Sequence, residues 1–109
     1  VVVYLTDSMS GREDERASYL QLVSYTAGTR YVLVRIDRWR LLPRERVIGI
    51  GHELQHAVEI AGAPDVRDTA TLARLYRQIG WEGRTGHFET DRARAAGSRV
   101  RDQLNRQDW

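Results

Sequence analysis

The stretch RERVIGIGHELQHAVEIA, residues 44–61, decides what kind of domain this chain forms. Pro43 precedes it and Gly62 follows it, which are residues that typically start and end a helix, so we expect one helix here. Apolar residues recur along it with helical spacing, at Val47, Ile50, Leu54, Ala57, Val58 and Ala61. We expect this apolar arc to face the core. His52 and His56 lie on the opposite side, which we expect to line a cleft or to be covered by another segment.

The residues before this helix predict strands. Residues 1–5, 18–25 and 30–37 are short runs rich in β-branched and aromatic side chains. Residues 26–29 join the last two runs and contain a Gly, as is typical of a hairpin connection. Residues 8–16 are polar and charged, so we expect a loop there. The sequence therefore predicts a three-stranded, mostly antiparallel sheet.

The residues after it predict two more helices. The first covers residues 69–79, where Tyr76 lies on an apolar stripe and is expected to pack in the core. Residues 80–87 contain three Gly and are expected to form a loop. The second helix is expected from residue 88 or 89 to residue 106. Strands followed by helices are typical of the α+β class, so we expect residues 1–109 to form a single domain with a small sheet packed on three helices.

Composition and charge exclude several classes of function. The chain has 17 basic residues, all of them Arg, and 15 acidic ones, giving a net charge of +2. The two signs are interleaved along the sequence, whereas binding to nucleic acid requires a clustered basic surface, so we expect no nucleic-acid partner. No apolar run is long enough to span a membrane, so we expect no membrane partner. The absence of Cys excludes thiolate catalysis and Cys-ligated metals.

The segment His52-Glu53-Leu54-Gln55-His56 is an HExxH motif in the middle of the first predicted helix. Residues four apart lie on one side of a helix, so two imidazoles can bind the same metal ion. Glu53 points about 100° away and can act as general base on a metal-bound water without ligating the metal. The alternative is a structural role for two His whose spacing is coincidental, because only three residues of the motif are fixed.

A catalytic zinc site needs a third protein ligand and an open position for water. The acid or imidazole candidates are Glu59, Glu82, His87 and Glu89. Three ligands from one helix cannot surround an ion, so we expect Glu59 either to support a ligand or to be solvated. Glu82 lies in a Gly-rich loop where no neighbouring pattern fixes it.

Glu89 is the preferred third ligand. It aligns with an apolar stripe on the last predicted helix, formed by Ala93, Ala96, Val100 and Leu104. A carboxylate at the end of a core-facing stripe needs a partner, which a zinc ion provides. The alternative is that Glu89 only opens the helix, where an acid suits the helix dipole. His87 is the second candidate, and it is otherwise placed to donate a hydrogen bond to a tetrahedral intermediate.

HExxH on a helix, followed by a Glu on another helix, resembles the zincin metallopeptidases of the gluzincin type. The small size and the strand–helix order are similar to the minimal members of that fold, the minigluzincins. Residues 51–59 together with Phe88-Glu89-Thr90 also resemble a group of small, uncharacterised bacterial proteins with the HELQH motif. The resemblance implies Zn²⁺ at His52, His56 and Glu89, with Glu53 as general base and acid in the hydrolysis of peptide bonds.

The resemblance also implies that a sheet edge binds an extended peptide or protein substrate, and we assign this edge to residues 30–37. One position departs from the gluzincin pattern. A supporting acid often stands one turn after the third ligand, where this chain has Ala93, and Asp91 or Asp68 is the candidate substitute. The second functional hypothesis is a non-catalytic or latent zinc-binding module of the same fold, since so small a domain has little surface around the site to bind a substrate.

Overall fold

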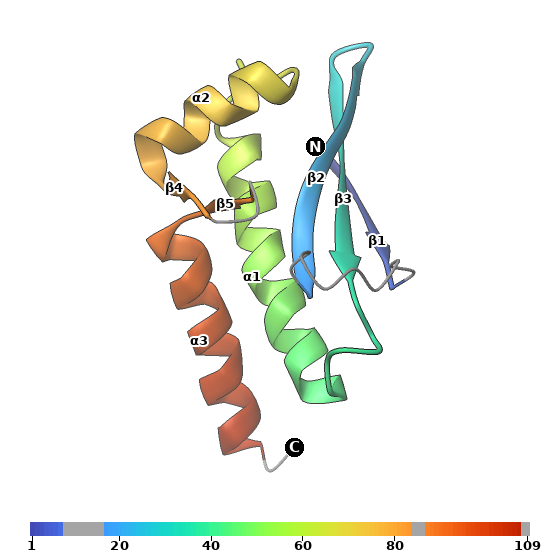
Figure 1. The fold of residues 1–109 in the computed structure, drawn as a ribbon, viewed down its shortest axis with the longest axis vertical. Coiled ribbons are helices and arrows are strands. Elements are labelled where there is room, and N and C mark those ends of the chain that lie inside the picture. Colours follow the sequence, from blue (N-terminus) through green and yellow to red (C-terminus); the bar gives the residue numbers. More distant parts are fainter. Residues whose placement is uncertain (8–16, 84–86, 108–109) are drawn as a thin grey trace.

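The computed structural model describes residues 1–7, 17–83 and 87–107 and confirms the α+β class (Figure 1). Three strands precede three helices along the chain, and a pair of two-residue strands connects the second helix to the third. The elements are β1 (Val2–Thr6), β2 (Ser18–Thr26), β3 (Thr29–Ile36), α1 (Pro43–Ala61), α2 (Thr69–Ile79), β4 (Trp81–Glu82), β5 (Phe88–Glu89) and α3 (Asp91–Arg106). No helix in these described ranges combines the length and apolar character that crossing a membrane requires.

The sheet has the strand order β1-β3-β2 and is mixed. β2 and β3 form the predicted antiparallel hairpin, whose turn places Ala27 and Gly28 at positive φ, while β1 runs parallel to β3. The assignment of residues 30–37 to an edge strand is wrong, because β3 is the central strand. Its inner positions Val32 and Val34 expose at most 1% of their surface, as expected for a central strand with α1 packed on its inner face.

α1 lies across the inner face of the sheet, between β2 and β3 on one side and α3 on the other (Figure 1). Ala57 and Ile60 of α1 pack against Val32 of β3, and α2 closes the same core with Leu72 and Tyr76. The prediction that Tyr76 is a core residue is therefore confirmed. This packing puts the middle of α1, with the HExxH motif, in the interior of the domain.

The predicted orientation of α1 is confirmed at Ala57, which is buried in the core, but is wrong for Leu54 and Val58. Leu54 and Val58 of the expected apolar arc expose 43% and 61% of their surface, whereas Glu53 and His56 are buried. A glycine on the side of α1 that faces α3 explains part of the difference between the predicted and the observed orientation. A Cβ at Gly51 would lie 2.7 Å from Val100 Cγ2, so glycine at this position lets α3 approach α1 closely.

α3 begins at Asp91, later than predicted. Thr90 is its N-cap and accepts a hydrogen bond from Ala93 N at 3.1 Å. The preceding Phe88 and Glu89 are extended and pair with β4, so the stripe on α3 does not include Glu89. α2 has the predicted bounds, and its N-cap is Asp68, whose carboxylate accepts a hydrogen bond from Thr71 N at 2.8 Å.

Candidate metal centre

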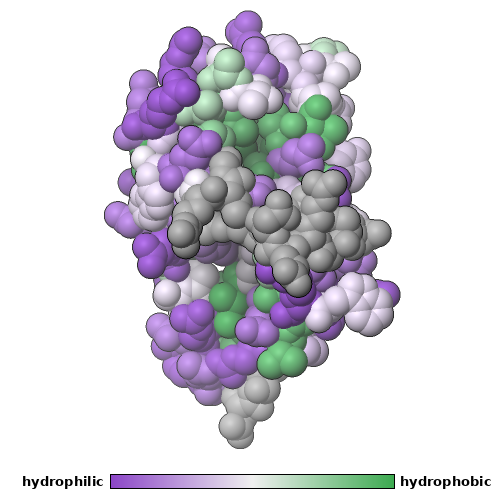
Figure 2. All heavy atoms as spheres, viewed as in Figure 1, coloured by the Kyte–Doolittle hydropathy of each residue, from purple (hydrophilic) through white to green (hydrophobic). Residues whose placement is uncertain are grey.

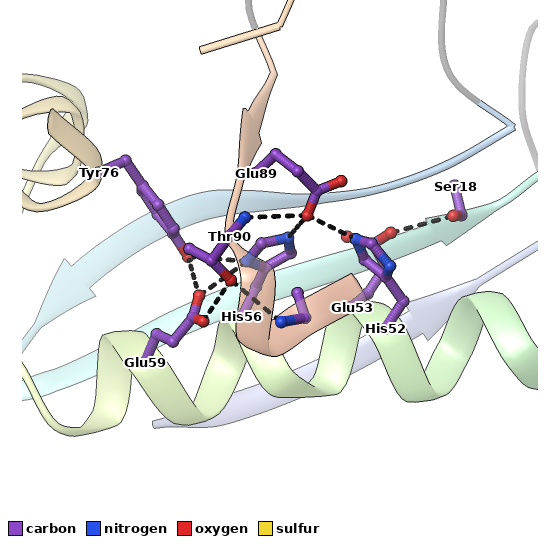
Figure 3. A network of polar contacts seen from close by, with 9 residues as sticks. Ser18, His52, Glu53, His56, Glu59, Tyr76, Glu89 and Thr90 are labelled. Atoms are coloured by element: carbon purple, nitrogen blue, oxygen red, sulfur yellow. Dashed lines mark hydrogen bonds and ion pairs between the residues drawn. The ribbon is translucent and has the colours of Figure 1, made fainter. Parts of the chain in front are cut away.

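The motif residues of α1 and the acid of β5 meet between β2 and the start of α3 (Figure 3). His52, Glu53 and His56 each offer a ligand atom, and these atoms lie within 4.8 Å of one another. The i,i+4 spacing thus brings the two imidazoles together, as the sequence predicted. Their ring centroids are 5.2 Å apart.

Glu89 reaches both imidazoles. Its Oε1 lies 2.9 Å from His52 Nε2 and 3.4 Å from His56 Nε2, and the residue exposes 4% of its surface. The residue predicted from the helical stripe is therefore at the site, although β5 and the backbone of Thr90 position it. Burial works to raise the pKa of Glu89, but the two His side chains outweigh burial and hold it well below its usual range.

His56 is held in one orientation by its second ring nitrogen. Nδ1 lies 2.8 Å from Glu59 Oε1 and 3.2 Å from the Tyr76 hydroxyl. Nε2 is buried and has no partner with hydrogen-bond geometry among the described residues. Burial alone would lower the pKa of His56, but its contacts with Glu59 and Glu89 raise it to about 9. When Nδ1 carries the proton, Nε2 presents its lone pair to the centre of the site.

Glu59 connects three segments of the fold. Its Oε1 contacts His56 and also accepts a hydrogen bond from the Tyr76 hydroxyl at 3.2 Å. Its Oε2 accepts a hydrogen bond from Thr90 Oγ1 at 2.6 Å. Only 6% of its side chain is exposed, so Glu59 is not solvated and instead contacts His56. The roles of Tyr76 and Thr90 were missed, because nothing local in the sequence links them to a residue 17 or 31 positions away.

Glu53 exposes 3% of its surface and lies on the sheet side of α1. Ser18 Oγ, from the first residue of β2, donates a hydrogen bond to Glu53 Oε2 at 3.0 Å. Burial raises the pKa of Glu53, and the charges of His52 and His56 oppose this rise only in part. No local pattern in the sequence links Ser18 to Glu53, because the two residues are 35 positions apart.

The other candidates lie elsewhere. Glu82 is exposed on β4, and Asp91 is exposed in the first turn of α3. Asp68 is also exposed and caps its own helix. His87 contacts the ring of Tyr19, with centroids 4.6 Å apart, and lines a pocket beside the motif.

Two pockets adjoin the motif, and both include Glu53. The first, of about 350 Å³, lies on the His56 side and is lined by four consecutive residues of β2 (19–22) and by Leu72 and Phe88. Apolar side chains gather between α2 and β2 on the face where this pocket opens (Figure 2). The second, of about 330 Å³, lies on the His52 side. Glu53 therefore lies between two cavities.

Comparison of the chain with protein-family models, with curated proteins and with solved structures found no match.

Proposed function

We propose that this chain is a zinc-dependent hydrolase of peptide bonds. In this proposal His52, His56 and Glu89 hold Zn²⁺, and Glu53 is the general base. The observation that carries it is the convergence of two imidazole Nε2 atoms on one buried carboxylate oxygen, at 2.9 and 3.4 Å. Two His and one Glu form a donor set used by catalytic zinc sites that keep a position open for water.

The chemistry of these donors fits a zinc ion. His56 Nε2 is a buried polar atom without a hydrogen bond among the described residues, and a metal ion would satisfy it. Glu59 supports the ligand role of His56. A carboxylate that accepts a hydrogen bond from the second ring nitrogen fixes the tautomer and makes the other ring nitrogen a stronger metal ligand.

Zinc, when bound, would lower the pKa of a water ligand to about 7 and polarise the substrate carbonyl. The remaining work falls to Glu53. It accepts the proton of the attacking water and passes it to the nitrogen of the leaving amine, which a raised pKa favours. Ser18 binds Oε2 and so leaves Oε1 available for this transfer.

The substrate that suits the site is an extended polypeptide. β2 pairs with β3 on one side only among the described residues, and residues 19–22 of its other edge line the larger pocket. An added strand would bind there through main-chain hydrogen bonds. Leu72 and Phe88 make the pocket suitable for a large apolar side chain of that strand.

The test uses metal-free protein that is titrated with zinc and assayed on a library of fluorogenic peptides. We expect one zinc per chain, loss of that zinc in His56→Ala, and hydrolysis that Glu53→Gln abolishes while zinc stays bound. Glu82→Gln, at an exposed acid outside the site, is the matched control and should retain both properties.

Two outcomes would contradict this proposal in different ways. Zinc bound without hydrolysis of any peptide would identify the latent or non-catalytic module instead. Absence of zinc binding would mean that the ion pairs of His52 and His56 with Glu89 are structural.

A further inference from the structure

β1 is an unprotected sheet edge. In the described parts of the chain it pairs only with β3, in continuous register from Val2 to Thr6. Its sequence, VVYLT, contains no charged residue and no Pro. Edge strands normally carry a charge, a Pro or a bulge that prevents pairing with another chain. β1 has none of these features, so the outer edge of Val2–Leu5 is suited to pairing with a further strand.

The opposite edge of the sheet differs in this respect. β2 contains an irregularity at Val23, where the register with β3 shifts between Leu22 and Ser24. Its free edge also lies beside His87, which contacts Tyr19. A bulge twists an edge away from regular pairing. The shift lies beyond residues 19–22, so this part of β2 can still bind a peptide, whereas a strand that pairs along the whole edge is favoured at β1.

The exposed apolar surface continues from β1 towards α1. Val3 and Leu5 lie in register with buried inner positions of β3 and so point to the helix-covered side of the sheet. The His56 flank of α1 faces the β2 edge. Leu54 and Val58 project from the opposite flank of the helix, on the side where β1 lies.

We propose that the chain forms a twofold-symmetric dimer in which β1 pairs antiparallel with β1 of a second copy. A symmetric interface brings the same patch of both subunits together and must be self-complementary. With Val3 on the axis, Val1 lies opposite Leu5 and Val2 lies opposite Tyr4. Each of residues 1–5 then meets an apolar partner on its own face, and the two sheets become one of six strands.

The exposed area reaches the lower end of the range for specific interfaces, about 1,200 Å² in total over two copies. Seven apolar side chains, five from both faces of residues 1–5 and two from α1, expose between 38% and 61% of their surface. They are Val1, Val2, Val3, Tyr4, Leu5, Leu54 and Val58. Together they expose apolar area on the order of 600 Å² per copy, the upper end for the largest patch of a monomer, against ~800 Å² per partner in a standard interface.

The test measures the mass of the protein in solution by light scattering and sedimentation over a wide concentration range. We expect the wild-type chain to have twice the mass of one chain. Val3→Lys places two like charges directly opposite each other and should halve the mass. Val3→Glu should do the same, and mixing the two variants should restore a dimer that contains one copy of each.

Val23→Lys is the control, because Val23 exposes 56% of its surface on the other edge strand. It should leave the dimer intact. A monomeric wild-type chain would overturn the proposal, because β1 would then not pair with a second copy of the chain. A dimer that Val23→Lys dissociates, or that survives Val3→Lys, would overturn it too. Recovery of the heterodimer shows that the charged variants are folded, and circular dichroism checks each one alone.

Discussion

On α1, Glu53 and His56 expose 3% and 4% of their surface, whereas Leu54 and Val58 expose 43% and 61%. One helix thus buries acid and imidazole and leaves aliphatic side chains in contact with solvent. Burying polar groups is tolerated only when each finds a partner. Here the partners come from β2, α2 and the start of α3, so the orientation of α1 depends on contacts that are distant in sequence.

Removal of Glu59 should have the largest effect on this arrangement. Glu59→Ala deletes an acceptor shared by three groups, the ring of His56, the phenol of Tyr76 and the hydroxyl of Thr90. We expect about 2–4 kcal/mol of lost stability, because buried polar groups lose their partner. We also expect zinc affinity to fall roughly 10–100-fold. Urea unfolding and zinc titration measure the two effects.

Glu82→Ala is the control for Glu59→Ala, since Glu82 is exposed on β4. It should change stability by less than about 0.5 kcal/mol. Equal effects of the two variants would mean that the buried network does not determine the orientation of α1.

The stability of the metal-free protein should fall as pH rises from 6.5 to 9. The folded pKa of His56 is about 9, above the value of 6.5 for an unperturbed imidazole. The folded state therefore binds more protons in this window, so the stabilisation is complete below pH 6.5 and is lost by about pH 9. We expect a decrease of about 1–3 kcal/mol. Urea unfolding with a chelator present measures it.

Zinc should remove this dependence on pH, because a metal on Nε2 replaces the second proton of His56. His87→Gln is the matched control and should keep the slope seen in metal-free wild type. A flat profile in the metal-free protein would show that His56 is not held as a cation by its acidic neighbours.

Gly51→Ala should destabilise the domain, although Ala is favoured over Gly in helices by about 1 kcal/mol. The new Cβ would lie 2.7 Å from Val100 Cγ2, and the stiff Val side chain forces α1 and α3 apart. We expect a net loss of about 1–2 kcal/mol in thermal or urea unfolding. Val100→Ala in the same chain should recover stability. A stabilised single variant would mean that the two helices are not in close contact at this point.

The sequence predicted what local chemistry determines. The start of α2 follows from the capping side chain of Asp68, and the convergence of His52 and His56 follows from their spacing along a helix. Glu89 was selected because a core-aligned acid needs a partner, although β5 rather than α3 carries it. These features need no knowledge of distant residues.

The rest depends on tertiary contacts. Apolar periodicity on α1 indicated two different sides but assigned the wrong one to the core, because Ser18 and Thr90 satisfy the polar side from 31 or more residues away. The parallel pairing of β1 was missed for the same reason. β-Rich composition identifies a strand but not its direction or its place in the sheet.

The smallest effect is expected on the exposed side of α1. Leu54→Gln should change stability by less than about 0.5 kcal/mol, since the side chain is 43% exposed. Ile60→Ala, at a fully buried position two turns along the same helix, should cost about 2–5 kcal/mol. Both are compared by urea unfolding in the Val3→Lys background, so that association does not contribute. A loss in Leu54→Gln comparable to that in Ile60→Ala would place Leu54 in the core and reverse the orientation of α1 described above.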